Sequence, residues 1–437
     1  MSDLLKPLKF CVFDLETTGG NLKNDRIIEI GMVQIDELEI TEKKSFLVDP
    51  KRQIPDFIQR LTSIKQKDVK GQRTIEELID EILEFIGDRI LIAHNASFDV
   101  PFLNAVLKRL GREELENRSI CTNLMTKYLI PTLMNSNLNY MSKIFDISHN
   151  HAHRALDDAD ATARLFLKYI DIFQDKGIQK INHLYYPKNR FELDLTHFKK
   201  SKDSLEDIEK KIKKIQCPYV MTFKGAQGVI LYAYAASSTS SAEQDFLISK
   251  VKELDWRNIS IRLAGPYTEA LIKLDLVLSK IPKVAQDEII EKIKEFNIPE
   301  TPLEKAGELK SRVDHINQSD FIILNHLVPG QYIIYPIAAM GRKSGLIFRF
   351  PGHKKKLIQY LNSKSNRMQN GKFKKQVVSS ALKEVFDVHV ANCLLQDKEV
   401  FLFKRHNNFN DNENFFKNLD IYLSKNKNSY NYPKKYI

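Results

Sequence analysis

The chain has 437 residues, of which 43% are hydrophobic and 28% are charged, and its formal net charge is +11 at pH 7. This length predicts roughly two to four domains, and the hydrophobic fraction is ordinary for globular proteins. No apolar run approaches the roughly 18 residues of a membrane helix, and no N-terminal stretch resembles a signal peptide. The four cysteines are scattered without zinc-ligand spacing, which is typical of buried thiols in a reducing compartment. We therefore expect a cytoplasmic protein that does not bind membranes.

Acidic and basic residues are unevenly distributed along the chain. Residues 1–175 contain 23 lysines and arginines against 28 aspartates and glutamates, whereas the remaining residues contain 44 against 28. Carboxylates in the acidic part could serve chemistry, and the basic part is suited to contacts with a polyanion such as nucleic acid. Basic runs are also common on solvated faces, and the sequence leaves that alternative open.

The first informative stretch is residues 9–19, where a short apolar run ends in Asp14-Leu15-Glu16. Such a run predicts a strand buried on both faces. Because side chains alternate along a strand, Asp14 and Glu16 point the same way at the carboxyl end of a central strand, where open α/β sheets bind their ligands. The alternative is that the two carboxylates simply end a strand at the surface.

Hydrophobic periodicity predicts the elements that follow. Alternating apolar and β-branched residues predict strands, and apolar residues at helical spacing behind a capping box at Thr74 and Glu77 predict a helix. The elements expected after the first strand are strands over residues 26–36, 40–48 and 89–93 and helices over residues 74–87 and 101–110.

A second carboxylate site follows the strand at residues 89–93. Asp99 stands near the start of the next helix, where it can face the same cleft as Asp14 and Glu16. The alternative is a carboxylate that only stabilises the positive end of that helix.

The third informative stretch is residues 149–160, H-N-H-A-H-R-A-L-D-D-A-D, which leads into a long helix. Five helical steps would turn His153 and Asp158 to different faces, so His153 is expected on the approach to the helix rather than within it. The pattern alone does not choose Asp158 over Asp157 or Asp160. The alternative is that these residues are only loop polarity and a solvated first turn.

Taken in order, F-D-L-E-T-T-G, H-N-A-S-F-D-x-x-F-L and H-R-A-L-D-D-A resemble the three motifs of the proofreading-type, DnaQ-like (DEDDh) 3′-to-5′ exonucleases. The resemblance covers roughly residues 8–172. It implies an α/β, ribonuclease H-like fold with a mixed five-stranded sheet flanked by helices. The family's His-x4-Asp pattern selects His153 and Asp158.

The resemblance also implies the site residues. Four carboxylates close together repel one another unless cations lie between them, so the family pattern implies two divalent metal ions, Mg²⁺ or Mn²⁺. The imidazole of His153 would act as general base on the attacking water. The implied metal ligands are Asp14, Glu16, Asp99 and Asp158, and the implied substrate contacts are Thr17, Thr18, Gly19, His94, Asn95 and Phe102.

The rest of the chain predicts smaller α+β accessory domains. Residues 213–290 weakly resemble a GIY-YIG nuclease domain, with Tyr219 and Tyr232 at its tyrosine positions, but serines at 237–241 and Leu274 replace the expected basic residues and metal-binding Glu. The alternative is an unrelated module whose tyrosines only pack. The remaining expected parts are an exonuclease domain over 1–175, a basic linker over 176–212, a small basic domain over 291–405 and a disordered tail over 406–437.

The sequence thus predicts a metal-dependent 3′-to-5′ exonuclease that releases nucleoside monophosphates from DNA 3′ ends in repair or proofreading. The expected partners are single-stranded DNA and a DNA polymerase or repair protein. Two alternatives stay open: an exonuclease that trims RNA, and a non-catalytic binding or scaffold protein in DNA repair.

Overall fold

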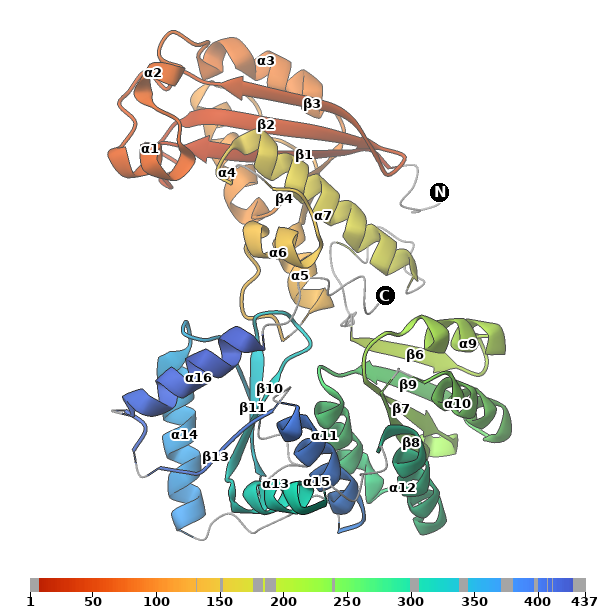
Figure 1. Ribbon diagram of the computed structural model, residues 1–437. Helices are drawn as coiled ribbons and strands as arrows, with labels where there is room; N and C mark the ends of the chain where they lie inside the picture. Colours follow the sequence, from red (N-terminus) through yellow and green to blue (C-terminus); the bar gives the residue numbers. More distant parts are fainter. Residues whose placement is uncertain are drawn as a thin grey trace. The chain divides into compact units, whose positions relative to one another are not determined.

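The computed structural model describes residues 8–130, 132–149, 152–175, 184, 194–237, 240–298, 306–337, 345–370, 380–396, 400–406, 408–410 and 412–426. The chain forms two compact units, Met1–Leu193 and Asp194–Ile437, which are described separately (Figure 1). Within the described residues, no helix has the length and apolar character needed to cross a membrane.

The first unit is built on one five-stranded sheet with the order β3-β2-β1-β4-β5. Strand β1 pairs antiparallel with β2 and parallel with β4, β2 pairs antiparallel with β3, and β4 pairs parallel with β5. This mixed sheet confirms the predicted α/β, ribonuclease H-like fold class. The strands are β1 (Phe10–Thr17), β2 (Ile27–Asp36), β3 (Glu39–Leu47), β4 (Ile90–Ala93) and β5 (Ser119–Cys121).

Helices cover both faces of this sheet (Figure 1). On one face, α3 (Ile75–Ile86) and α4 (Ala96–Arg109) form a hydrophobic core with alternate residues of β1 such as Phe13 and Leu15. On the other face lies α7 (Ala155–Asp175), where Phe166 packs 5.0 Å from Phe10 between ring centroids. The shorter helices are α1 (Asp56–Thr62), α2 (Gln66–Val69), α5 (Thr122–Leu129) and α6 (Leu138–Ile144).

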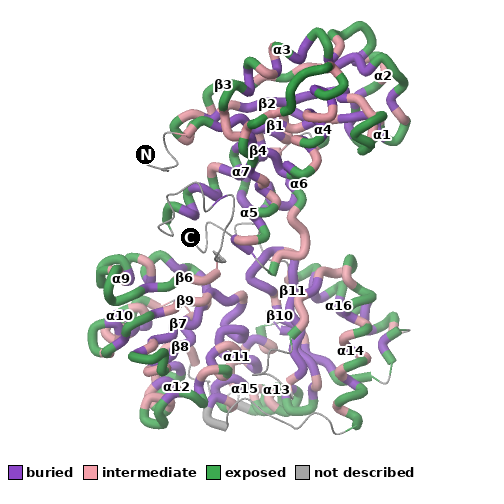
Figure 2. Tube along the Cα trace, turned by 180° about the vertical axis from the view of Figure 1, so that it is seen from behind, coloured by how far each residue is buried: buried purple, intermediate pink, exposed green. Residues whose placement is uncertain are grey.

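The two central strands diverge where β1 ends. The parallel pairing of β1 with β4 stops at Val12 and Ile92, whereas β1 continues beside β2 as far as Thr17. The last residues of β1 therefore have a free edge toward β4, which is the place at which open α/β sheets bind ligands. Figure 2 shows that β1, β2 and β4 are largely buried, whereas the outer strand β3 and the outer helical faces are more exposed.

Two residues of β2 hold the start of α7 against the sheet. Glu29, with 2% of its side chain exposed, accepts hydrogen bonds from Arg154 Nη2 at 2.7 Å and Nε at 3.1 Å, and from the backbone N–H of Ala155 at 2.9 Å. A Cβ atom on Gly31 would lie 2.2 Å from the carbonyl carbon of Ala155, so only glycine allows this approach.

The second unit contains two four-stranded sheets. The first has the order β6-β9-β7-β8 and the second the order β12-β11-β10-β13. The strands are β6 (Leu195–Lys199), β7 (Tyr219–Lys224), β8 (Ile230–Ala236), β9 (Asn258–Leu263), β10 (Phe321–Asn325), β11 (Tyr332–Pro336), β12 (Leu346–Phe348) and β13 (Val400–Phe403). The helices are α9 (Leu205–Lys214), α10 (Ser241–Glu253), α11 (Tyr267–Leu278), α12 (Lys283–Asn297), α13 (Ala306–Gln318), α14 (Lys354–Gln369), α15 (Ser380–Leu395) and α16 (Glu413–Lys425).

Two parts of the predicted domain organisation differ from the structure. The predicted linker over 176–212 includes β6, which pairs antiparallel with β9, whereas α9 forms where a helix was expected over 204–215. The predicted disordered tail is wrong for α16, because Phe415, Phe416 and Leu419 lie in the core of the second unit. The composition of residues 406–437 is rich in asparagine and lysine, which led to the prediction of disorder although apolar residues recur at helical spacing in α16. Most of residues 176–193 and all of residues 427–437 lie outside the described residues.

The predicted hairpin around the two tyrosines is present as β7 and β8, which pair antiparallel. Tyr219 and Tyr232 are 0% and 2% exposed, and their hydroxyl groups have no hydrogen-bond partner among the described residues. The ring of Tyr232 packs edge-on against Phe223. These positions fit tyrosines that pack in a core, and a GIY-YIG relationship stays a prediction.

Replacing Gly31 with alanine tests how closely α7 must approach β2. Its Cβ would meet backbone atoms of Ala155, so α7 must shift, and overpacking of this kind costs about 1–3 kcal/mol. We expect a lower thermal unfolding midpoint for the full-length Gly31→Ala variant. Gly20→Ala is the matched control, because a Cβ at Gly20 meets nothing within 4 Å. Equal midpoints for the two variants would contradict the close approach.

Candidate active site

Strand β1 carries the first two carboxylates. Asp14 and Glu16 are two residues apart, and both are half-buried on the strand face opposite Phe13 and Leu15. In the register with β2, Asp14 is paired with Gly31 and Glu16 with Glu29. The two carboxylates therefore face the side of the sheet on which α7 begins.

Helix α4 supplies Asp99 to the free edge of β1. The carboxylate accepts a hydrogen bond from the backbone N–H of Leu15, the residue between Asp14 and Glu16. Only 3% of Asp99 is exposed, and burial raises its pKa to about 7 against the lowering effect of the backbone hydrogen bonds. The divergence of β1 from β4 is what leaves room for this side chain.

The third segment brings His153 and Asp158 to the same place. His153 lies in the turn before α7 with a positive φ of 66°, and Asp158 lies in the first turn of α7. Ligand atoms of Glu16, His153 and Asp158 lie within 4.8 Å of one another. Asp160 instead forms ion pairs with Lys43 at 2.7 Å and Arg164 at 3.0 Å. Among the aspartates that the pattern left open, the structure places Asp158 in the cluster.

The carboxylates of the cluster raise one another's pKa. For Asp14, burial and then the negative charges of Asp99, Asp158 and Glu16 raise the pKa well above its ordinary value. For Glu16, burial and the charge of Asp158 raise the pKa to about 8, although Arg154 opposes the effect. These interactions show that Asp14 and Asp99 lie within electrostatic reach of the other two carboxylates.

This donor set fits divalent cations. Carboxylate oxygens are the ligands that Mg²⁺ and Mn²⁺ prefer, and a cation removes the repulsion that raises these pKa values. Asp14, Glu16, Asp99 and Asp158 could hold such ions, with His153 beside them.

Sequence reasoning missed His149. Its Nε2 atom lies 2.5 Å from Asp158 Oδ1, and its buried Nδ1 atom has no hydrogen-bond partner among the described residues. The other carboxylate oxygen of Asp158 accepts a hydrogen bond from the backbone N–H of His153 at 3.3 Å. Three histidines at every second position from His149 to His153 were the available signal, but only the third matched a family position.

The predicted substrate-binding turn is tightly organised. Thr17 Oγ1 donates to the carbonyl of Gly19 at 2.8 Å, and Thr18 Oγ1 donates to Asp25 Oδ1 at 2.9 Å. A Cβ on Gly19 would lie 2.5 Å from Asp25 Oδ2. Both threonine hydroxyls are therefore used within the turn, and its contact with a nucleotide stays a prediction.

The other predicted substrate contacts have different surroundings. His94 is buried: its Nε2–H donates to the carbonyl of Ser136 at 2.8 Å, so its Nδ1 accepts from Thr122 Oγ1 at 3.0 Å. Asn95 is exposed and accepts a hydrogen bond from Asn123. The predicted contact of Phe102 with substrate does not fit its position. Its side chain is 0% exposed in the core, because it shares the inner face of α4 with Leu103 and Val106.

Comparison with known proteins places this site in a family. A family model described as Exonuclease matches residues 11–166. The PolC-type DNA polymerase III of Clostridium perfringens is 46% identical over 181 residues, 40% of this chain and 12% of that protein. The DNA polymerase III subunit epsilon of Aquifex aeolicus is 37% identical over 171 residues, 39% of this chain and 85% of that subunit. The structure of exonuclease X in complex with 5′ overhanging duplex DNA is 27% identical, with a TM-score of 0.31, over 37% of this chain and 91% of that chain.

The first unit is thus an exonuclease domain of the ribonuclease H-like class. The chain belongs to the family of DnaQ-like, proofreading-type 3′-to-5′ exonucleases through residues 11–166. This confirms the family and the enzyme class predicted from the three motifs. The chain spans only 12% of the length of the PolC-type relative.

The stability of the metal-free protein should fall as pH rises. Folding raises the pKa of Asp14, Glu16 and Asp99. Their contribution to stability is therefore fully present below their ordinary values of about 4 and is lost as pH rises through about 7 to about 8. In EDTA, we expect the thermal midpoint of wild type to drop over this range more than that of Asp14→Asn, which lacks one repelling charge.

The matched control for this measurement is Asp88→Asn, which changes an exposed aspartate outside the cluster. It should keep the wild-type pH dependence. Adding Mg²⁺ or Mn²⁺ should raise the wild-type midpoint most at the alkaline end. A wild-type profile parallel to that of Asp14→Asn would contradict the mutual repulsion.

Proposed function

We propose that this chain is a metal-dependent 3′-to-5′ exonuclease that releases nucleoside monophosphates from DNA 3′ ends, in repair or proofreading. The observation that carries the proposal is the convergence of Glu16, His153 and Asp158 within 4.8 Å, inside the electrostatic reach of Asp14 and Asp99. Hydrolysis of a phosphodiester adds negative charge in the transition state, and bound divalent cations supply the positive charge that stabilises it.

The carboxylates and His153 would have different roles in the reaction. Asp14, Glu16, Asp99 and Asp158 would hold the cations and so place the scissile phosphate. His153 would accept a proton from the attacking water at a ring nitrogen, because it is exposed on a turn beside Glu16 and Asp158. The leaving 3′ oxygen takes up a proton as the bond to phosphorus breaks.

DNA is proposed as substrate, and a DNA polymerase as partner, because the similar proteins are a PolC-type DNA polymerase III and a DNA polymerase III subunit epsilon. The RNA-trimming alternative is tested by comparing the degradation of 5′-labelled single-stranded DNA and RNA of the same sequence in Mg²⁺. Equal or faster loss of RNA would overturn the DNA assignment. Degradation of neither strand would favour the non-catalytic scaffold.

Asp158→Asn should abolish hydrolysis while preserving the fold. The substitution keeps the size of the side chain but removes a charge that the cations need, so we expect a loss of at least about a hundredfold in kcat. The measurement is release of mononucleotides from labelled single-stranded DNA, with unfolding midpoints compared in parallel. Asp157→Asn, one residue away in the same turn, is the control and should keep its activity. Full activity of a folded Asp158→Asn variant would exclude this site.

His153→Ala should reduce the rate by about a hundredfold or more if this imidazole is the general base. Metal-dependent thermal stabilisation should persist, because the carboxylates remain. A folded variant with the wild-type rate would assign the proton transfer to another group.

A further inference from the structure

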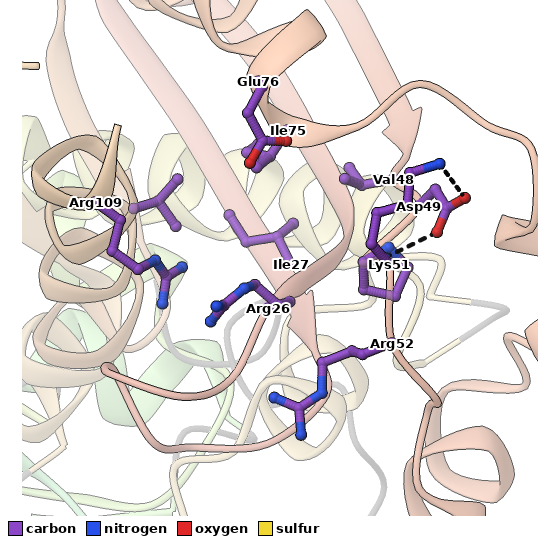
Figure 3. A pocket seen from close by; sticks show the side chains of 11 residues that line it. Arg26, Ile27, Val48, Asp49, Lys51, Arg52, Ile75, Glu76 and Arg109 are labelled. Atoms are coloured by element: carbon purple, nitrogen blue, oxygen red, sulfur yellow. Dashed lines mark hydrogen bonds and ion pairs between the residues drawn. The ribbon is translucent and has the colours of Figure 1, made fainter. Parts of the chain in front are cut away.

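A cavity of about 450 Å³ lies in the first unit at the start of β2 (Figure 3), where Ile27 is the register partner of Thr17 at the end of β1. Four apolar residues of the core that contains Phe13 and Leu15 form part of its lining. These residues are Ile27, Val48, Ile75 and Val106. The cavity therefore lies on the α3 and α4 face of the sheet, whereas Asp14 and Glu16 face α7.

Cationic side chains dominate the polar lining of this cavity. Arg26, Lys51, Arg52 and Arg109 line it together with the carboxylates of Asp49 and Glu76. The carboxylate of Asp49 is paired with Lys51: it accepts hydrogen bonds from the backbone N–H of Lys51 at 2.9 Å and from Lys51 Nζ at 3.0 Å. This concentration of arginines contrasts with the net negative charge of residues 1–175.

Toward the residues that the structure describes, Arg26, Arg52 and Arg109 each use only one of their guanidinium nitrogens as a hydrogen-bond donor. Their hydrogen bonds within the described residues come from Nη1 and go to backbone carbonyls of residues 22–25. Within the described part of the chain, no carboxylate forms an ion pair with Arg26, Arg52 or Arg109, and no partner is found for their Nε and Nη2 donors. Arg26 and Arg109 approach each other in Figure 3, and burial together with the charge of Arg26 lowers the pKa of Arg109, although the charge of Glu76 opposes the effect. An anion between them would relieve this repulsion.

The loop over residues 17–25 lies between the cavity and the catalytic carboxylates. This loop directly follows Glu16, and the backbone N–H of Thr18 donates to the carbonyl of Arg26 at 2.8 Å. Arg109 Nη1 donates to the carbonyls of Leu22 and Asp25 in the same loop, at 3.0 and 3.1 Å. A polyanion with its end at Glu16 can reach the cavity by crossing this short loop.

We propose that the cavity binds a nucleotide unit of the substrate strand upstream of its 3′ end, with the phosphate on Arg26 and Arg109 and the sugar or base over the apolar lining. This inference rests on the proposed function. Forked guanidinium donors match phosphate oxygens, and the apolar lining favours a nucleotide over a bare ion or an acidic peptide. The volume is within the range of small-ligand pockets.

The test measures binding by the full-length chain carrying Asp158→Asn, so that the probe is not consumed. Fluorescence anisotropy gives Kd for a long and a short single-stranded oligodeoxynucleotide, of about 12 and about 3 nucleotides. Adding Arg109→Gln or Arg26→Gln should weaken binding of the long probe by about tenfold, and of the short probe by less. Each should also reduce the slope of log K against log salt by about 0.7.

Arg112→Gln is the matched control. Arg112 lies just beyond the end of α4, pairs with Asp80 at 2.9 Å and does not line the cavity. It should keep the affinity and salt slope of the parent. Equal affinities for Arg109→Gln, Arg26→Gln and Arg112→Gln would overturn the proposal. So would an equal loss for both probe lengths, which would indicate that the arginines only support the loop.

A polyglutamate peptide serves as the competing probe. Peptide binding that depends on Arg109 as strongly as DNA binding does would overturn the nucleotide assignment in favour of an acidic protein partner. Failure of the proposed function is separable, because it would appear as absent hydrolysis by the wild-type chain whatever the binding results.

Discussion

The contact between the start of α7 and the middle of β2 is the constraint on which the site depends. His153 and Asp158 are more than 130 residues from Asp14 and Glu16 in sequence, and only α7 brings them close. Gly31 allows the backbone of Ala155 to approach β2, and Glu29 fixes that approach by binding Arg154 and the backbone N–H of Ala155. Since Gly31 and Glu29 are the register partners of Asp14 and Glu16, the helix is fixed beside the carboxylates it must meet.

Asp14, Glu16 and Asp99 lie where burial disfavours their ionised forms. Burial and mutual repulsion raise the pKa of Asp14 and Glu16, while Asp99 is held by the backbone N–H of Leu15 as well as by its helix. The rest of the domain must therefore stabilise the arrangement, which the hydrophobic core around Phe13 does. A group of ligands fixed in this way has little reorganisation to undergo when cations bind, and the arrangement favours cation binding over protonation as pH rises.

Much of the first unit was predictable because its signals are local. The buried strand ending in Asp14 and Glu16, the helix behind Thr74 and the polar start of α4 each have a pattern a few residues long. Long-range packing was not predictable: Glu29 and Gly31 read as ordinary strand residues, and the contact of His149 with Asp158 depends on a turn that the pattern does not specify. In the second unit, the apolar stripe from Phe415 to Leu423 was hidden by a polar composition, and β6 became a strand only by pairing with β9.

The loop between β1 and β2 separates a cluster of carboxylates from a cluster of arginines. On the α7 side, negative side chains collect around the place where cations would bind, and on the α3 and α4 side, three arginines hold the loop carbonyls and leave donors free. A domain of net negative charge has little long-range attraction for a polyanion, so its affinity must come from local contacts of both kinds. Thr18 and the backbone N–H of Asn21 donate hydrogen bonds to Asp25, and Gly19 packs closely against it. These contacts restrain the loop, so a strand bound on one side of it would lie at a set distance from the carboxylates on the other.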